Sequence, residues 1–274
     1  MKHSLQAALV FAAATLALAA PAAADQLEDI QAKDELVCGT IGTVPPFSFQ
    51  DPATRTTVGY DVDICNLIAE GLGVKARIVL VAGAARIPEL NQGHLDVVTG
   101  SLGWTPERAR QVDYSYSYYF SNQMVGVTEK SGIDSVRELE GKRVSAQSAS
   151  TSEAIAKEKL PGSQIVSFQD VPQALLARNQ GRVQGLVLSE LMLRNFAATS
   201  AGTDTAIKVL EDSTLMVEKV GVGVRKGQEI LLARVNEILA GADESGALNA
   251  IYDKWLGKDS QFNMPRSFQV APIE

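Results

Sequence analysis

The sequence predicts an α/β protein with a mainly parallel sheet. Short runs of apolar and β-branched residues alternate with segments of helical periodicity, which is the pattern of repeated βαβ units. The 250 residues after position 24 exceed the usual size of a single hydrophobic core and leave room for one large or two modest domains. No internal repeat or low-complexity linker interrupts this alternation.

The first series of elements occupies positions 36–99. We expect strands at 36–41, 76–81 and 96–99, and helices at 62–72 and 87–92. The order strand, helix, strand, helix, strand is that of consecutive βαβ units, and it therefore favours parallel pairing of the strands.

A second series begins after position 119. We expect strands at 124–128, 143–146, 164–168 and 221–225, and helices at 136–139, 153–159, 172–179, 230–239 and 248–255. Ser135 with Glu138, and Ser150 with Glu153, match the capping box at a helix start, and Gly181 follows a helix end. These local signals support the helices of the second half of the chain.

The first 24 residues have the pattern of a secretory signal peptide. Lys2 precedes an apolar run at 5–20, and the small residues at 22–24 form a cleavage site between Ala24 and Asp25. No cysteine follows the run, which favours a soluble periplasmic protein over a lipoprotein. The alternative is an uncleaved anchor, but the run is shorter than a typical membrane span.

Charge and composition exclude several classes of protein. Cleavage removes Lys2 and no acid, so 24 basic and 32 acidic side chains remain, a net charge of −8 that argues against nucleic-acid or anionic-membrane partners. His94 is the one histidine left, in a segment that indicates a surface turn. We therefore expect no metal site, cofactor, catalytic triad or other catalytic residue.

Cys38 lies in the first expected strand and Cys65 in the first expected helix. An oxidising periplasm permits them to pair, and a disulfide closing a loop of this length contributes about 3 kcal/mol. The alternative is two free thiols packed between strand and helix. We favour the disulfide.

The segment Gly100-Ser-Leu-Gly-Trp-Thr-Pro-Glu-Arg108 is the most informative in the chain. Thr105 is a candidate N-cap and Pro106 suits the first helical position, which places Arg108 in the first turn beside free backbone N–H groups. A guanidinium fork at such a place suits a small carboxylate. Three further motifs accompany it, namely Val44-Pro-Pro-Phe-Ser-Phe49, Gly59-Tyr-Asp-Val-Asp-Ile64 and Ile251-Tyr-Asp-Lys-Trp255.

Together these motifs resemble those of the periplasmic polar amino-acid-binding proteins of ABC importers, solute-binding family 3. The resemblance implies a bilobed periplasmic-binding-protein fold of type II, with two α/β lobes joined by two hinge strands. Lobe one would comprise residues 25–120 plus 218–274, lobe two residues 121–217, and residues 1–24 the signal peptide. The ligand would bind in the cleft between the lobes.

The resemblance also assigns contacts to the ligand carboxylate. Arg108 corresponds to the arginine that clamps it, and Ser101 with the backbone of Gly103 would donate further hydrogen bonds. From lobe two, Thr151 would donate its hydroxyl at a helix start capped by Ser150. Gly103 departs from the usual Ser or Thr, so one hydroxyl is missing. The alternatives are that Arg108 is an exposed helix arginine and that Ser150 begins an ordinary capped helix.

Other departures bear on the identity of the ligand. Ser189 stands where the family usually has an aspartate that pairs with the ligand ammonium, a loss of about 1 to 3 kcal/mol that the adjacent Glu190 could offset. Val44 and Gly83 replace aromatic residues that flank the ligand side chain. Ile41 stands where relatives that bind basic amino acids carry an acid, which disfavours lysine, arginine and ornithine.

Arg86 suggests an acidic ligand. It resembles an arginine that members binding glutamate or aspartate place near the side-chain carboxylate, although a surface arginine is an equal alternative. With Arg108 and the neutral Ser189, Arg86 describes a site richer in positive than in negative charge. Glutamate or aspartate is therefore the first candidate ligand, and an amine-free or amine-blocked dicarboxylate is the second.

The function implied by the resemblance is a monomeric, non-enzymatic receptor. It would capture an amino acid in the periplasm, close by hinge motion and deliver the ligand to the permease subunits of an ABC importer. A dehydratase-like enzyme on the same fold is the alternative, with Glu190 as its candidate acid or base. A sensor input domain is a third possibility, disfavoured because no output module follows Trp255.

Overall fold

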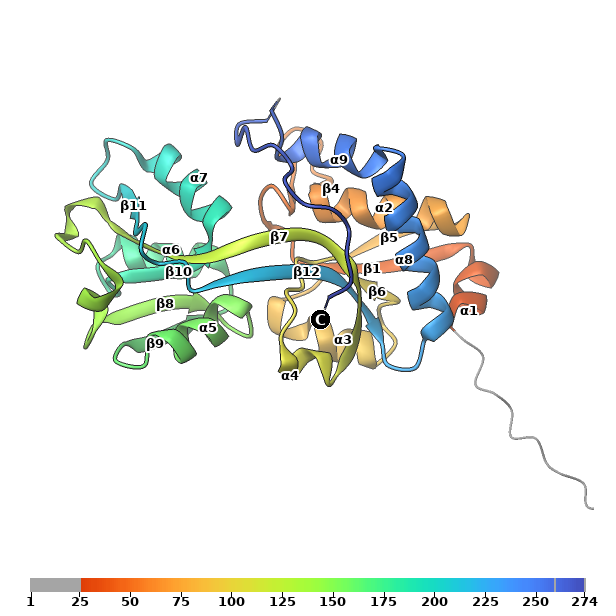
Figure 1. The fold of residues 1–274 in the computed structure, drawn as a ribbon, viewed down its shortest axis with the longest axis horizontal. Coiled ribbons are helices and arrows are strands. Elements are labelled where there is room, and N and C mark those ends of the chain that lie inside the picture. The colour runs from red at the N-terminus through yellow and green to blue at the C-terminus, as the bar shows by residue number, and fades with distance from the viewer. Residues whose placement is uncertain (1–25, 259, 274) are drawn as a thin grey trace, which may run out of the picture.

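The computed structural model describes residues 26–258 and 260–273, which form two α/β lobes joined by a long two-stranded ribbon (Figure 1). The predicted α/β class and bilobed architecture are therefore confirmed. The expected signal peptide lies outside the described residues. No helix among those residues is long and apolar enough to cross a membrane.

Lobe one carries both ends of the described chain. Its strands are β1 (Glu35–Thr40), β5 (Lys75–Leu80) and β6 (Val97–Val98), and a separate antiparallel sheet contains β2 (Thr43–Val44), β3 (Ser48–Gln50) and β4 (Thr57–Val58). Its helices are α1 (Gln26–Lys33), α2 (Tyr60–Leu72), η1 (Gly83–Ala85), α3 (Arg86–Asn91), α4 (Pro106–Ala109), α8 (Glu229–Glu244) and α9 (Ala247–Trp255). β1 pairs in parallel with β5 and β6, as the βαβ pattern predicts.

Lobe two is built from the middle of the chain. It contains strands β8 (Arg143–Gln147), β9 (Gln164–Phe168), β10 (Gly185–Ser189) and β11 (Ile207–Val209). Its helices are η2 (Glu129–Ser131), η3 (Val136–Leu139), α5 (Thr151–Lys159), α6 (Val171–Asn179) and α7 (Glu190–Ser200). β8 pairs in parallel with both β9 and β10.

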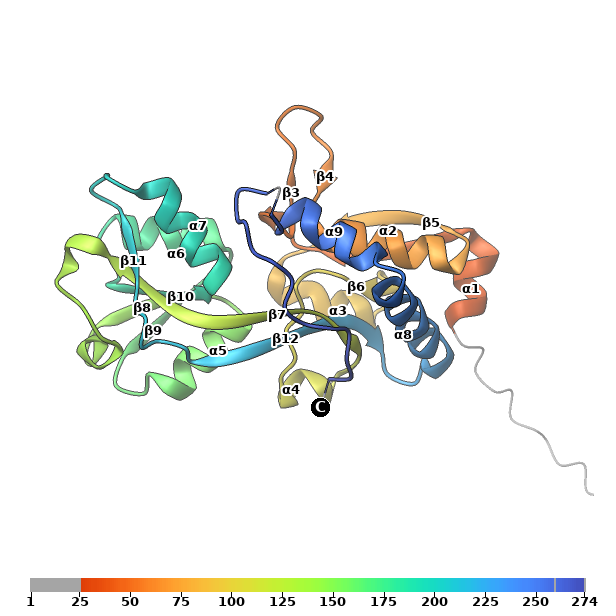
Figure 2. The same ribbon diagram turned by 45° about the horizontal axis from the view of Figure 1, so that its top comes forward.

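The ribbon between the lobes consists of β7 (Val112–Thr128) and β12 (Met216–Arg225), which run side by side in both views of the molecule (Figures 1 and 2). Their antiparallel pairing makes one continuous sheet of order β5-β1-β6-β12-β7-β10-β8-β9, with β11 also paired to β7. The sheet is therefore mixed and not mainly parallel as predicted, because the ribbon strands pair antiparallel with the parallel strands of both lobes. The register shifts on both sides of Gly221, so the ladder is irregular near the middle of the ribbon.

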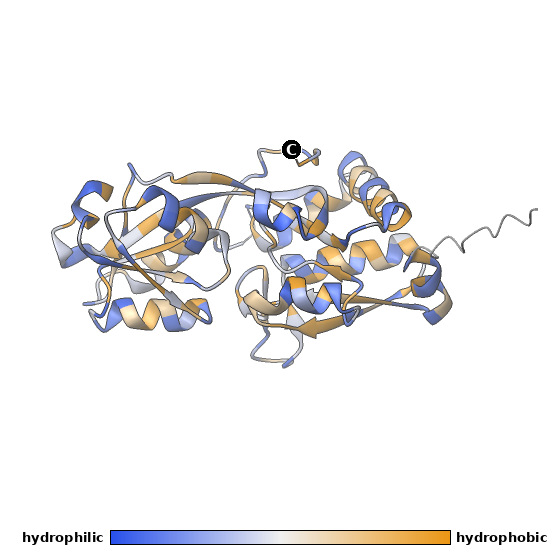
Figure 3. Ribbon diagram, turned by 90° about the horizontal axis from the view of Figure 1, so that it is seen from below, coloured by the Kyte–Doolittle hydropathy of each residue, from blue (hydrophilic) through white to orange (hydrophobic). Residues whose placement is uncertain are grey.

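Each lobe has an apolar interior between sheet and helices. Leu36, Ile64 and Val97 are fully buried in lobe one, and Val144 and Val187 in lobe two. Figure 3 shows the corresponding pattern, with hydrophobic strands between helices that have one hydrophobic and one hydrophilic side. Burial of these faces is the main force that holds each lobe together.

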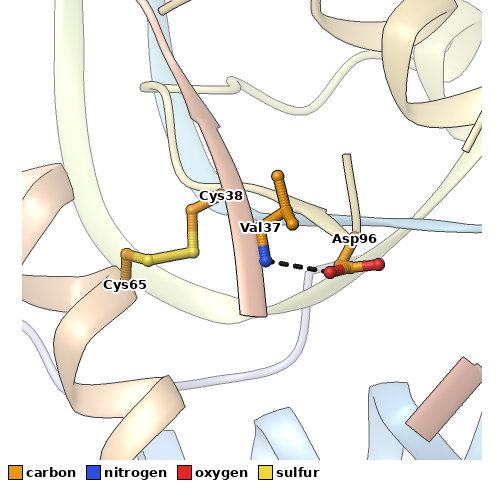
Figure 4. The surroundings of a disulfide bond; sticks show 4 residues. All are labelled: Val37, Cys38, Cys65 and Asp96. Atoms are coloured by element: carbon orange, nitrogen blue, oxygen red, sulfur yellow. Dashed lines mark hydrogen bonds between the residues drawn. A yellow bond between two sulfur atoms is a disulfide. The ribbon is translucent and has the colours of Figure 1, made fainter. Parts of the chain in front are cut away.

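Cys38 of β1 and Cys65 of α2 are joined by a disulfide, with 6.2 Å between their Cα atoms (Figure 4). On the other side of β1, the backbone N–H of Val37 donates to the Asp96 carboxylate at 2.8 Å. The first strand of lobe one is thus attached covalently to the helix that covers it and by a side chain to the loop before β6.

The C-terminal segment runs back over the ribbon. The Phe268 ring lies 6.1 Å from the Tyr119 ring and 5.7 Å from the Tyr252 ring, and Ser117 forms an isolated bridge with Ala271. Arg266 forms a largely buried ion pair with Asp243 of α8. This segment therefore connects the ribbon to the last helices of lobe one.

Most predicted elements lie close to observed ones, but several observed elements differ from the prediction or were not predicted. The segment 136–139 is a 3₁₀ turn, and Ser135 makes no side-chain cap to a backbone N–H. The expected strand at 124–128 is the end of the 17-residue β7. The strands β2 to β4, β10 and β11 and the helices α1 and α7 were not predicted, and for β2 to β4 the reason is that two- and three-residue strands carry too few residues for a period-2 pattern.

Candidate functional site

A cavity of about 70 Å³ lies where the two lobes and the ribbon meet. Its lining from lobe one comprises Ile41, Val44, Phe47, Arg86, Ser101 and Arg108. The ribbon contributes Tyr119, Ser121, Gln123, Glu218 and Val220, and lobe two Gln147, Ser150, Thr151, Ser152, Val171, Leu188, Ser189 and Met192. The cavity therefore combines one apolar wall with a cluster of hydroxyl, amide and charged groups.

Arg108 links the two lobes directly. Thr105 accepts a hydrogen bond from the Arg108 backbone at 3.2 Å and Pro106 opens α4, so the predicted cap holds. The guanidinium is largely buried: Nη1 donates to the Gly103 carbonyl at 2.7 Å and to the Thr151 hydroxyl at 3.0 Å, and Nη2 to the Ala149 carbonyl at 2.6 Å. The structure thus brings together the arginine and threonine expected to clamp a carboxylate.

Thr151 is the first residue of α5, where local sequence determines its position. The Ser150 hydroxyl accepts from the Glu153 N–H at 3.1 Å, and the Glu153 carboxylate accepts from the Ala149 N–H at 2.6 Å. This is a capping arrangement like the one predicted, with the reciprocal bond moved one residue earlier. The helix start therefore presents the Thr151 side chain to the cavity.

Ser101 lines the cavity, but its hydroxyl is engaged within lobe one. It donates to Asp61 Oδ2 at 2.6 Å, and the Tyr118 hydroxyl donates to Asp61 Oδ1 at 2.8 Å. Burial raises the pKa of Asp61 to about 7, although both hydrogen bonds oppose the rise. The expected donation from Ser101 to a ligand is thus replaced here by donation to a buried carboxyl.

Arg86 is also held by lobe one. Its Nε donates to the Gly83 carbonyl at 2.9 Å, and its Nη1 donates to the Gly100 and Ser101 carbonyls at 2.6 and 3.1 Å. Burial, with repulsion from Arg108, lowers the pKa of Arg86 to about 10. It is not the surface arginine of the alternative interpretation, because only 3% of it is exposed.

Ser189, the last residue of β10, and Glu190, the first residue of α7, have side chains in different surroundings. The Ser189 hydroxyl is buried on the cavity wall and has no hydrogen-bond partner among the described residues. Glu190 accepts from Asn122 and from Arg194, each at 2.7 Å, and does not line the cavity. Glu190 is therefore not placed to substitute for the missing aspartate or to serve as an acid or base in this cavity.

Glu218 is the functional candidate that the sequence analysis missed. It lies on β12, is largely buried, and accepts a hydrogen bond from the Gln123 amide. Burial raises the pKa of Glu218, while the Thr151 hydroxyl and Arg108 oppose the rise. Glu218 stands two and four residues before the buried Val220 and Val222, so the period-2 pattern of the sequence places it on the same side of the strand and was a usable signal.

Gly103 lies against this acid. Its N–H donates to the Ser101 carbonyl at 3.1 Å, and its carbonyl accepts from Arg108 and from the Tyr114 hydroxyl at 3.0 Å. Both backbone polar groups of Gly103 therefore form hydrogen bonds within the protein, whereas we had expected its backbone to donate to a ligand. Burial raises the pKa of Tyr114 to about 12, so its hydroxyl stays protonated and donates.

Among the described residues no group of three His, Cys, Asp or Glu side chains is arranged to hold a metal ion. The chemistry that the cavity offers is hydrogen bonding and charge pairing: two guanidinium groups, one carboxyl, several hydroxyls and an apolar wall. A bilobed α/β protein with such a cavity at its hinge has the architecture of a solute receptor.

The chain belongs to the bacterial extracellular solute-binding proteins, family 3, whose profile matches residues 36–258. It is 30% identical over 239 residues to an ABC transporter glutamine-binding protein of Bacillus subtilis, covering 86% of each chain. It is 27% identical over 235 residues to an L-cystine-binding protein of Escherichia coli, covering 85% of this chain and 86% of the relative.

Solved structures agree with this assignment. An ancestral arginine-binding protein bound to arginine matches with a TM-score of 0.75 and 32% identity, covering 82% of this chain and 99% of that chain. An ancestral amino-acid-binding protein, described as a precursor of cyclohexadienyl dehydratase, matches with a TM-score of 0.76 and 30% identity over 85% of this chain and all of that chain. The type II periplasmic-binding-protein fold is thereby confirmed.

Proposed function

We propose that this protein is the periplasmic substrate-binding component of an amino-acid ABC importer and that it delivers its ligand to a membrane permease. Family membership supports a solute-binding role, and relatives are named for glutamine and cystine. The observation that carries the proposal is Arg108, whose buried guanidinium lines the cavity and reaches Thr151 across the cleft. A guanidinium fork beside a hydroxyl matches a carboxylate in shape and charge.

The same pair of residues supplies a mechanism for closure. Arg108 belongs to lobe one, whereas Thr151 and Ser189 belong to lobe two. A ligand between them contacts both walls, binds the closed arrangement better than the open one, and so shifts the population toward closure. The closed form is the one that the permease would recognise.

The lining favours an amino acid with an uncharged side chain. Arg86, which the sequence suggested for an acidic side chain, already donates three hydrogen bonds to carbonyl groups. Ile41, Phe47 and Leu188 add apolar surface beside the polar cluster. An uncharged side chain uses this surface without requiring a second cation, because burial of an unpaired carboxylate is costly.

An acidic ligand is the second candidate, and one atom favours it. Nη2 of Arg86 has no hydrogen-bond partner among the described residues, although Arg86 lines the cavity. Glutamate, aspartate or an amine-free dicarboxylate could therefore receive one charge-assisted hydrogen bond from it.

Calorimetric titration of refolded, ligand-free mature protein tests both candidates. The panel contains glutamine, cystine, glutamate, aspartate, arginine and succinate. We expect glutamine or cystine to bind, and Arg108→Ala to weaken binding about 100-fold, since a buried charge-assisted contact contributes about 3 kcal/mol. Arg110→Ala is the matched control, because Arg110 is exposed at the end of the same helix.

The other outcomes separate the alternatives. Binding of glutamate or aspartate that is lost in Arg86→Ala would favour the acidic ligand. Binding of succinate alone would favour an amine-free acid. Recovery of a chemically altered ligand would indicate an enzyme, and no binding at all, with the variants folded, would overturn the proposal.

A further inference from the structure

The cavity contains an acidic side chain that the sequence analysis did not predict. Among the described residues that line it, Glu218 is the only acidic side chain, and the guanidinium groups of Arg86 and Arg108 line the same cavity. Ser189, at the position where relatives usually carry an aspartate, is neutral. The acid of this cleft therefore comes from the hinge ribbon rather than from lobe two.

Glu218 can occupy its observed position because Gly103 has no side chain. A Cβ atom at position 103 would lie 1.6 Å from Glu218 Oε1 and 2.6 Å from the Thr151 hydroxyl. No side chain fits at such distances, so a Ser or Thr at 103 and the observed Glu218 position exclude each other. The absence of a side chain at 103 is thus what allows the acid at 218 its observed position.

Glu218 is also held in a defined orientation. The Ser152 hydroxyl donates to Gln123 Oε1 at 2.7 Å, and the Gln123 amide in turn donates to Glu218 Oε2. This chain of donors fixes one carboxylate oxygen and leaves the other beside Gly103 and Thr151. A carboxylate positioned by such a chain is preorganised for a cation.

We propose that Glu218 pairs with the α-ammonium group of the ligand and takes the role of the aspartate that Ser189 lacks. The inference rests on the proposed amino-acid-binding function. In an α-amino acid the carboxylate and the ammonium group are attached to the same carbon, so a carboxylate held by Arg108 and Thr151 places the ammonium group next to that clamp. Glu218 is the acid that lies there.

The charges of the site agree with this assignment. Arg108 donates to the Gly103 carbonyl and the Thr151 hydroxyl, and Glu218 lies against the same two residues, so the cleft combines a cation and an acid in the way that a zwitterion requires. Ser189 then contributes only a hydroxyl, and its buried, unpartnered oxygen is free to accept a hydrogen bond from the same ligand.

The test compares amino acids with their amine-free analogues. L-glutamine is paired with glutaramate and L-glutamate with glutarate, each titrated calorimetrically at pH 8. In wild type we expect the better-binding amino acid to exceed its analogue, and Glu218→Gln to reduce that preference about 10- to 100-fold, the range for a hydrogen bond to a charged group. Glu190→Gln is the matched control and leaves the preference unchanged.

Two further variants keep the test decisive. Ser189→Asp in the Glu218→Gln background restores the preference, because it returns an acid to the position used by relatives. Gly103→Ser displaces the Glu218 carboxylate and reduces the preference even if Glu218→Gln does not fold.

The possible results separate the two proposals. A wild type that binds amino acids while the preference survives in both Glu218→Gln and Gly103→Ser would overturn the role of Glu218 and leave the proposed function standing. Equal weakening of amino acid and analogue would make Glu218 a structural counter-ion and also overturn the inference. A wild type that binds none of the four compounds would overturn both.

Discussion

The two walls of the cleft differ in how their polar groups are held. In lobe one, Arg86 and Ser101 donate to groups of their own lobe. In lobe two, Thr151 and Ser189 are neutral hydroxyl residues, and the Ser189 oxygen has no partner among the described residues. Charge and fixed geometry therefore belong to the wall that would receive a ligand first, and adaptable hydroxyls to the wall that would close over it.

The largest expected effect is on the free energy of unfolding and comes from a substitution in lobe one. Asp61→Ala removes the buried acceptor of the Ser101 and Tyr118 hydroxyls, and each unsatisfied donor costs about 1 to 3 kcal/mol. We expect the free energy of unfolding, measured in urea, to fall by about 2 to 5 kcal/mol. Asp61→Asn keeps one acceptor oxygen and should lose less than half as much; an equal loss would contradict this account.

The pH dependence of the unfolding free energy is a second test of the role of Asp61. Because burial raises the pKa of Asp61 from 3.8 to about 7, the folded protein retains a proton that the unfolded chain has released between these values. The contribution of this group is complete below pH 4, falls as the pH rises to about 7, and is then constant. Asp61→Asn should show a flatter profile of unfolding free energy across this window than wild type.

An intermediate effect is expected on the wall of lobe two. Thr151→Val keeps the shape of the side chain but removes the hydroxyl that joins Arg108 to the cleft. Ligand affinity should fall about 10-fold, which corresponds to one hydrogen bond to a charged group. Thr199→Val on the exposed face of α7 is the control, and calorimetry with the bound amino acid is the measurement. An affinity change shared by both variants would show that the effect is not local to the cleft.

The smallest effect should come from Ser189→Ala. Among the described residues the buried Ser189 hydroxyl has no hydrogen-bond partner, so its removal should leave the unfolding free energy within about 0.5 kcal/mol of wild type or raise it. Affinity should fall only a few-fold. A stability loss of more than about 1 kcal/mol would mean that this hydroxyl is paired in solution.

The features that were predicted correctly are mainly those that depend on residues close together in the sequence. The cap at Thr105, the helix start at Ser150 and the βαβ order depend on neighbouring residues, and all three appear in the structure. The pairing of Cys38 with Cys65 required only that strand and helix pack together.

What the sequence did not predict depends on contacts between distant segments. Ser101 donates to Asp61, which lies 40 residues away, and Gln123 donates to Glu218 across 95 residues. The family resemblance pointed to position 189 as the place of a missing acid and gave no reason to expect one at position 218. The spacing of Val220, Val222 and Val224 in the sequence places position 218 on their side of the strand, and only the tertiary structure shows which groups meet it.

The irregular ladder near Gly221 lies beside Glu218 and Val220 on the same strand, so the floor of the binding cavity is also the place where the ribbon is least regular. Under the proposed closure, rotation about that point would move the outer rims of the lobes much farther than the floor. A ligand bound there would convert a displacement within hydrogen-bonding distance at the cavity into a large change in the surface that the two rims present together.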